Sequence, residues 1–155
     1  MTNQKIEALK SEAYKLWRSK QLDKAVEIIL KLEKIKSVRE DFDFNLIFSA
    51  CLSDDKKYSL AVRFLSRATG LNPSNELASN YLFVNLVTCK AYNLAMNELV
   101  RFLSDYPAKK NYKVTLHELL ADLNKGNAKK WEDQILHFSK KNRIPIKRYY
   151  PNSNK

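Results

Sequence analysis

The sequence predicts an all-α protein built as a solenoid of stacked helical hairpins. Three observations predict this fold: a segment that recurs at a 34-residue spacing, apolar residues spaced three to four apart, and a 155-residue chain with only two glycines and four prolines. Few glycines and prolines favour helices, because tight turns and strand connections usually need more of both. Apolar residues at three-to-four spacing fall on one face of a helix, and recurrence indicates repeated units.

The recurrent segment gives the repeat its length. Residues 56–73 read KKYSLAVRFLSRATGLNP, and residues 90–107 read KAYNLAMNELVRFLSDYP. Both begin Lys-x-Tyr-x-Leu-Ala and reach a proline twelve residues after the alanine. A weaker copy upstream begins at Lys20, and its alanine, Ala25, lies 36 residues before Ala61. The equivalent alanines are Ala25, Ala61 and Ala95. Helices that approach closely need a small residue at the contact, and a hairpin that cannot bury its apolar face alone stacks on the next copy.

Each unit is expected to contain two helices. In the first unit, apolar spacing runs from Ile6 to Trp17 and resumes from Val26 to Leu32. The second and third units are each followed by a proline, which cannot continue a helix. Their helices are expected at 43–53 and 58–71, then at 76–89 and 92–105.

After Pro107 the period fades, although helical spacing continues. Residues 112–123 and 128–141 are expected to form a terminal hairpin that turns at 125–127. End units of an array need an atypical outer face to stay soluble. The expected organisation is three hairpins (1–109), a terminal hairpin packed on them (110–141) and a basic tail (142–155).

The unit length, the small residue that opens the second helix and the closing proline resemble the tetratricopeptide repeat family. The resemblance covers about residues 4–107 and is strong in the second helices, QLDKAVEIIL, KYSLAVRFLSRATGLNPSN and AYNLAMNELVRFLSDYP. It is weak in the first helices, where the family's tryptophan position holds Leu9, Asn45 and Ser79 and its glycine position holds Ala13, Ser49 and Phe83. The resemblance implies an α–α superhelix. The alternative is an ordinary helical bundle in which the two segments are similar by chance.

In that family the first helices line the concave side of a curved array. The resemblance therefore implies a partner-binding face with aromatic, apolar and few charged side chains, suited to an extended or helical peptide with hydrophobic anchors. The expected concave residues are Lys10, Tyr14, Trp17, Asp43, Leu46, Ala50, Asn80, Val84 and Val87. For Trp17 and Val87, burial between neighbouring units is the alternative role.

Some family members hold an acidic C-terminus with a clamp of lysine, asparagine and arginine. The matching positions here are Lys10, Tyr14, Ile47, Leu77 and Tyr81. Only the first lysine is present, so we do not expect this clamp.

The formal net charge of +11 is concentrated near the C-terminus. Residues 108–155 hold 12 Lys or Arg against 4 Asp or Glu. Cations neutralise phosphates and tyrosines offer stacking faces, so binding of a polyanion or nucleic acid is the alternative function. It would use Lys140, Lys141, Arg143, Lys147, Arg148, Tyr149 and Tyr150. A solvated terminus, or a tail folded back over the last hairpin through Ile144, Ile146 and the two tyrosines, are the other possibilities.

The sequence shows no sign of catalysis. Gly70 and Gly126 are the only glycines and make no phosphate-binding loop, and the two cysteines and two widely spaced histidines make no metal-ligand spacing. We expect no catalytic residue, no metal and no cofactor. Cys51 and Cys89 lie in apolar helical patterns and are expected to be reduced and buried.

The expected compartment is the cytoplasm. No run approaches the roughly 20 apolar residues that cross a bilayer, and the N-terminal residues lack the apolar core of a signal peptide. The expected function is a scaffold, chaperone or immunity-type partner that binds a protein or peptide.

The repeat alignment makes a prediction about stability. Replacing Ala61 or Ala95 with tryptophan should lower the free energy of unfolding by on the order of 1–3 kcal/mol or more, because a large side chain overpacks the close helix contact. Thermal unfolding measures the effect. A melting temperature unchanged by both substitutions would contradict the alignment.

Overall fold

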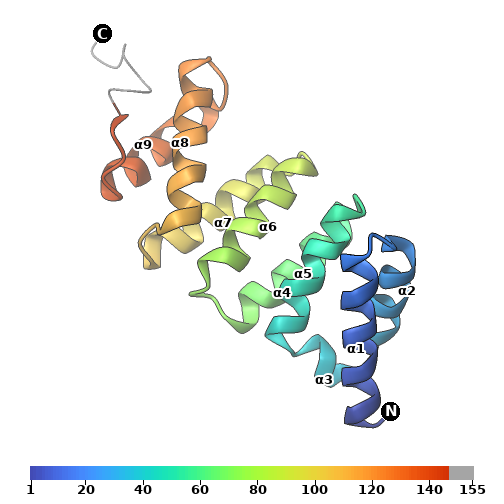
Figure 1. Cartoon of the computed structure of the whole chain (residues 1–155). Coiled ribbons are helices and arrows are strands. Elements are labelled where there is room, and N and C mark those ends of the chain that lie inside the picture. Colours follow the sequence, from blue (N-terminus) through green and yellow to red (C-terminus); the bar gives the residue numbers. More distant parts are fainter. Residues whose placement is uncertain (147–155) are drawn as a thin grey trace.

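The computed structural model describes residues 1–146, and over that range the chain consists of helices joined by turns and short loops, with no strand (Figure 1). The long helices pair in sequence order into hairpins. The pairs are α1 (Asn3–Arg18) with α2 (Leu22–Leu32), α4 (Phe42–Asp54) with α5 (Tyr58–Leu71), α6 (Glu76–Thr88) with α7 (Tyr92–Asp105), and α8 (Lys110–Asn124) with α9 (Glu132–Lys141). The predicted all-α array of helical hairpins is confirmed, and the second and third pairs begin and end within one residue of prediction.

The hairpins follow one another along a long axis. Figure 1 shows the N-terminal hairpin at one end of the molecule and the α8–α9 hairpin at the other. Neighbouring units are joined where α2 packs on α4, α5 on α6 and α6 on α8. The apolar core is correspondingly divided: Phe64 of α5 belongs to a cluster with the N-terminal helices, and the adjacent Leu65 belongs to the cluster of the C-terminal helices. Helix α5 therefore contributes to both halves of the array.

Two residues after the end of each first helix, the chain passes through a residue in the left-handed region of backbone conformation. The φ angle is 62° at Lys20, 58° at Lys56, 60° at Lys90 and 84° at Gly126. The next residue donates its backbone N–H to the carbonyl five residues earlier, at 2.8–2.9 Å in all four turns. This hydrogen bond is the mark of a Schellman motif, which satisfies carbonyls that the helix end leaves unpaired. The recurring lysine of the sequence repeat is thus the residue that reverses the chain.

The two departures from the 34-residue spacing have structural causes. Helix α2 has 11 residues where α5 has 14, but the connection 33–41 is longer than 72–75 and includes the one-turn helix α3 (Lys36–Arg39). The turn at Gly126 comes 36 residues after Lys90, because α8 has 15 residues where α6 has 13. Helix α8 therefore begins in register with the repeat, 34 residues after α6, and its turn comes two residues later than the period predicts.

The alanines of the repeat occupy the expected close contacts. Ala25, Ala61 and Ala95 are each the fourth residue of their helix, and all three are at most 1 % exposed. At such a position a side chain larger than a methyl group would meet the facing helix.

Helix α8 is capped by a side chain from another unit. It has no side-chain cap of its own. Instead the carboxylate of Glu76, buried in the first turn of α6, accepts the backbone N–H groups of Lys109 at 2.6 Å, Asn111 at 3.2 Å and Tyr112 at 3.1 Å. A carboxylate at a helix N-terminus also interacts favourably with the helix dipole. Glu76 thereby fixes the start of the terminal hairpin on the array.

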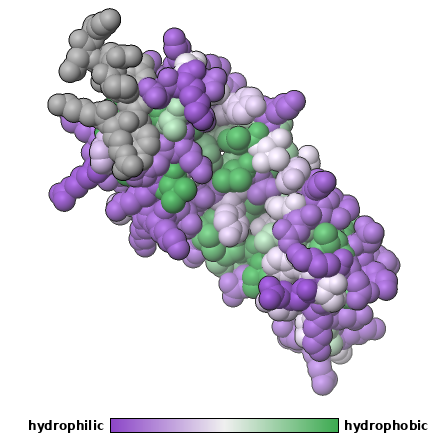
Figure 2. All heavy atoms as spheres, turned by 45° about the horizontal axis from the view of Figure 1, so that its top comes forward, coloured by the Kyte–Doolittle hydropathy of each residue, from purple (hydrophilic) through white to green (hydrophobic). Residues whose placement is uncertain are grey.

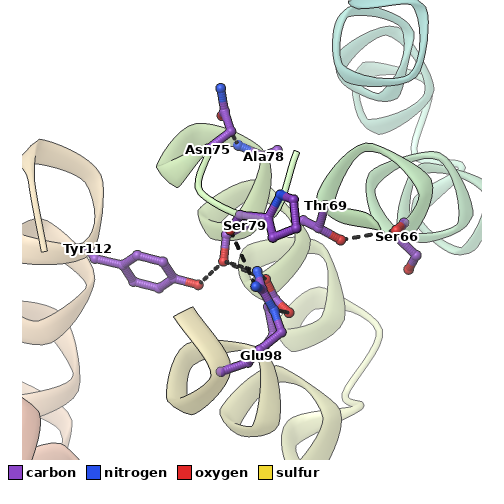
Figure 3. Close-up of polar contacts among 9 residues, drawn as sticks. Ser66, Thr69, Asn75, Ala78, Ser79, Glu98 and Tyr112 are labelled. Carbon is purple, nitrogen blue, oxygen red and sulfur yellow. Dashed lines mark hydrogen bonds and ion pairs between the residues drawn. The ribbon is translucent and has the colours of Figure 1, made fainter. Parts of the chain in front are cut away.

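A buried polar cluster joins the same helices (Figure 3). The Ser79 hydroxyl of α6 lies 2.8 Å from the Tyr112 hydroxyl of α8 and donates to Glu98 of α7, and Arg101 pairs with both oxygens of Glu98 at 2.6 and 2.8 Å. Burial raises the pKa of Tyr112, so the phenol stays protonated and can act as a donor. The cluster satisfies buried polar groups that would otherwise destabilise the junction.

The end of α9 holds the end of α7. The Lys141 ammonium donates to the carbonyls of Leu103 and Ser104 at 2.7 and 3.1 Å, and Asn142 accepts the N–H of Ala108 at 2.7 Å. Ile144 is buried in the C-terminal core cluster. The folded-back alternative for the tail therefore holds at Ile144, while Tyr149 and Tyr150 lie outside the described residues.

Two features of the chain differ from expectation. Cys51 is buried, and burial raises the pKa of its thiol to about 11, but Cys89 is exposed because it caps the end of α6 beside the turn at Lys90. The expected helix 128–141 begins instead with a 3-10 turn, η1 (Lys129–Trp131), which follows Ala128 in the left-handed region.

Among residues 1–146, no helix has the length and apolar character needed to cross a membrane.

The left-handed lysines predict a stabilising substitution. Lys90→Gly should raise the free energy of unfolding by about 0.5–1 kcal/mol, because a residue with a Cβ is strained at positive φ and glycine is not. The matched control is Lys90→Ala, which removes the same charge from the same position but keeps a Cβ and should therefore give no such gain. Urea unfolding followed by circular dichroism compares the two, and destabilisation by Lys90→Gly would contradict the assigned turn.

The cap from Glu76 predicts a local loss of stability. Glu76→Ala should lower the free energy of unfolding by about 2–4 kcal/mol, because it leaves the buried N–H group of Tyr112 and two part-buried N–H groups at the start of α8 without an acceptor. Hydrogen–deuterium exchange should become faster first at the start of α8. Glu118→Ala, which removes an exposed carboxylate from the same helix, serves as the control, and equal effects from the two substitutions would show that Glu76 has no capping role.

Candidate binding surface

All nine residues expected on the concave face lie on the first helices α1, α4 and α6, but they differ in exposure. Tyr14, Asp43, Val84 and Val87 are exposed; Lys10, Trp17, Leu46 and Ala50 are half-buried; and Asn80 is buried. Only part of the predicted set is therefore accessible to a partner.

Three of the nine use their polar groups within the fold. The Lys10 ammonium donates to Asp41, which caps α4, at 2.7 Å. The Trp17 indole donates to Asp54 of α4 at 2.7 Å, and the Asn80 amide donates to Thr115 of α8 at 2.7 Å. Each bond joins two neighbouring units. These groups orient the first helices and are not free to bind a partner.

Lys10 and Asp41 form an ion pair in which both side chains are charged. Burial is the largest single influence and opposes the charge on each side chain. It is outweighed by several contributions together: the hydrogen bond between the two groups and their opposite charges, the carboxylate of Glu7 beside Lys10, and the backbone N–H of Phe44 on Asp41. The pKa of Lys10 is therefore raised and that of Asp41 is lowered. Asp41 therefore contributes stability that is present above its unfolded pKa, about 3.9, and lost as the pH falls through its lower folded value. The junction between α1 and α4 stays intact at neutral pH.

Helix α6 presents the most apolar accessible face. Leu77, Tyr81, Val84 and Val87 lie at spacings of four, three and three residues along it, and each is 36–47 % exposed. Its only charged residue is the buried Glu76. Ile47 of α4 and Tyr14 of α1 are exposed at 42 and 46 %. We call the six residues Tyr14, Ile47, Leu77, Tyr81, Val84 and Val87 the first-helix strip.

Three members of the strip were not among the expected binding residues. Ile47, Leu77 and Tyr81 occupy the positions compared with the carboxylate clamp, where they were noted only as departures from it. For Leu77 and Tyr81, the helical spacing to Val84 was the signal that places them on the same face of α6. Ile47 lies on α4, and no such spacing links it to Val84. Figure 2 shows hydrophobic residues gathered along the middle of the molecule with hydrophilic residues around them.

A cavity of about 350 Å³ lies between α6–α7 and the loop that leads into α9. Val87 belongs both to the strip and to the cavity lining. The rest of the lining is Phe83, Tyr92, Ala95, Met96, Leu119, Asp122, Asn127, Ala128 and Trp131. The strip and the cavity are thus continuous at the C-terminal end of α6.

Two bulky residues at small-residue positions accompany the cavity. Phe83 is equivalent to Ala13 and Ser49, which are fully buried between helices. Trp131 comes five residues after the Gly126 turn, the position that alanine holds in the other hairpins. Both line the cavity, so large side chains keep the terminal hairpin from packing as closely as the other units do. Tyr92, the tyrosine of the recurrent Lys-x-Tyr segment, is 46 % exposed and lies beside Trp131, with ring centroids 6.2 Å apart.

The cavity also refines the expected cost of a large residue at Ala95. Ala95 lines the cavity, and Ala61 does not. A tryptophan at position 95 can therefore use part of this space, and we expect the smaller destabilisation at position 95.

The basic residues proposed for polyanion binding are only partly placed. Lys140 is exposed within the last turn of α9 and Arg143 is exposed after it, but the Lys141 ammonium donates to backbone carbonyls of α7. Lys147, Arg148, Tyr149 and Tyr150 lie outside the described residues. Within residues 1–146, no group of three or more His, Cys, Asp or Glu side chains is arranged to hold a metal ion.

No protein-family model matches the chain, and no curated protein matches its sequence. The tetratricopeptide resemblance consequently depends on the repeat within this chain.

Proposed function

We propose that the chain is a tetratricopeptide-like, non-catalytic module that binds a protein or peptide on its first-helix strip. The observation that carries the proposal is the accessible face of α6, which holds four large apolar side chains and no charged one. Contiguous exposed apolar surface bounded by polar residues is typical of interaction sites. A helix or an extended segment with apolar anchors at helical or alternate spacing would cover it.

Cross-unit hydrogen bonds support this use of the surface. Lys10 with Asp41, Trp17 with Asp54, and Ser53 with Asn85 at 2.8 Å hold successive first helices against one another. The strip is therefore preorganised, and binding requires little further ordering of the module. Adaptor, chaperone and immunity-type roles all use such a surface, and each would place a polypeptide on the strip.

The proposal predicts where a partner can be crosslinked. A photoreactive p-benzoylphenylalanine at position 84 should form a covalent adduct with a polypeptide when the tagged chain is irradiated in a native lysate. The matched control is the same residue at position 94, because Leu94 is an apolar residue of α7 that is 58 % exposed but lies outside the strip. Equal adducts at both positions, or none at position 84, would contradict the proposal.

A charge placed in the strip should weaken the same complex. Val84→Asp is expected to reduce recovery of the crosslinked partner about tenfold in a pull-down, because a carboxylate would be desolvated at the centre of the interface. Leu94→Asp should leave recovery unchanged. Unaltered melting temperatures confirm that both variants are folded.

Polyanion binding is the rival function, and the structure indicates which deletion of the basic tail can test it. Removal of residues 140–155 would also remove Lys141 and the buried Ile144, which hold the terminal hairpin. A chain ending at residue 146 keeps both. Steeply salt-dependent binding to nucleic acid that is lost in this shorter chain, with no polypeptide adduct at position 84, would favour the rival.

A further inference from the structure

The cavity at the end of the first-helix strip combines aromatic walls with one carboxylate. Tyr92 and Trp131 lie against each other with their ring planes tilted by 53°. Asp122 is the only charged residue in the lining, and Asn127 adds an amide. Aromatic faces attract cations, and a carboxylate in mostly apolar surroundings forms strong hydrogen bonds with a cationic group.

The same tryptophan already receives a cation from its own chain. The Lys130 ammonium lies 5.5 Å from the centre of the Trp131 ring and donates to Asn93 at 2.9 Å. Lys130 is held outside the cavity by this bond, so it does not neutralise Asp122 through any contact in the described part of the chain. The cavity therefore keeps an anionic character within a basic region.

We propose that the cavity receives an arginine side chain of the partner polypeptide, an inference that rests on the proposed function. The aliphatic part of arginine would pack on Phe83, Val87 and Met96. Its planar guanidinium can stack on an aromatic face and donate two parallel hydrogen bonds to one carboxylate, which a lysine ammonium cannot do. About 350 Å³ is ample for one such side chain.

The charges around the mouth determine what surrounds the arginine. Lys90 lies at the turn before Tyr92, and Lys125, Lys129 and Lys130 flank Asn127 and Trp131; Glu132 and Asp133 follow at the start of α9. This rim is more basic than acidic, so residues next to the anchor should be apolar or acidic. A polybasic segment would be repelled.

The experiment uses a random 12-residue peptide library displayed on phage and selected on the full-length chain. Enriched peptides should contain a single arginine beside apolar or acidic residues. Synthetic copies should bind Asp122→Asn about tenfold or more weakly, because the guanidinium loses its charged acceptor. The control Glu118→Gln, which removes an exposed carboxylate from the same helix α8 but outside the cavity lining, should bind as the unmodified chain does.

Two further readouts separate this inference from the proposed function. The enriched peptide should quench Trp131 emission in a Trp17→Phe variant, since the chain has only two tryptophans. Two results would overturn the arginine site and leave the strip as a binding surface. One is that the enriched peptides lack arginine. The other is that Val84→Asp weakens their binding and Asp122→Asn does not. Failure to enrich any peptide would overturn both.

Discussion

The turn after each first helix is the constraint on which the array depends. Three lysines and a glycine adopt positive φ at equivalent places, and a backbone hydrogen bond of 2.8–2.9 Å closes each turn. Because the chain reverses at the same point of every unit, the alanine five residues later meets its own first helix at the same height in the first three units. Lysine is an unusual choice for a left-handed position, but it places a cation at the helix C-terminus, where the helix dipole favours one.

The exposed face is a consequence of this regular stacking. The first helices α4 and α6 each pack on their own second helix and on both neighbouring units, and α1 packs on its second helix and on the one unit beside it, which leaves a narrow side of each helix uncovered. On α6 that side is apolar, whereas on α1 and α4 it also carries Glu7 and Asp43. The terminal hairpin departs from the regular packing, with Phe83 and Trp131 where other units have small residues, and the cavity lies at that departure. The proposed binding surface thus combines the regular and the irregular parts of the fold.

Much of the architecture could be predicted from the sequence, because the features that carry it are local. Three-to-four spacing, the alanine column and the prolines determine helix ends without knowledge of tertiary contacts. The site was less accessible. Burial of Asn80 depends on Thr115, 35 residues away, and exposure of Tyr92 depends on how the terminal hairpin docks. The cap from Glu76 to α8 has no local signature either, since a glutamate in a first turn usually serves its own helix.

A nuclear Overhauser spectrum of the full chain with labelled methyl groups tests the open array most directly. The account predicts contacts between methyl groups of successive hairpins and none between the α1–α2 hairpin and the α8–α9 hairpin, which lie at opposite ends of the molecule (Figure 1). Contacts between these two end hairpins would show a closed bundle, in which the first-helix strip would not be free to bind a partner.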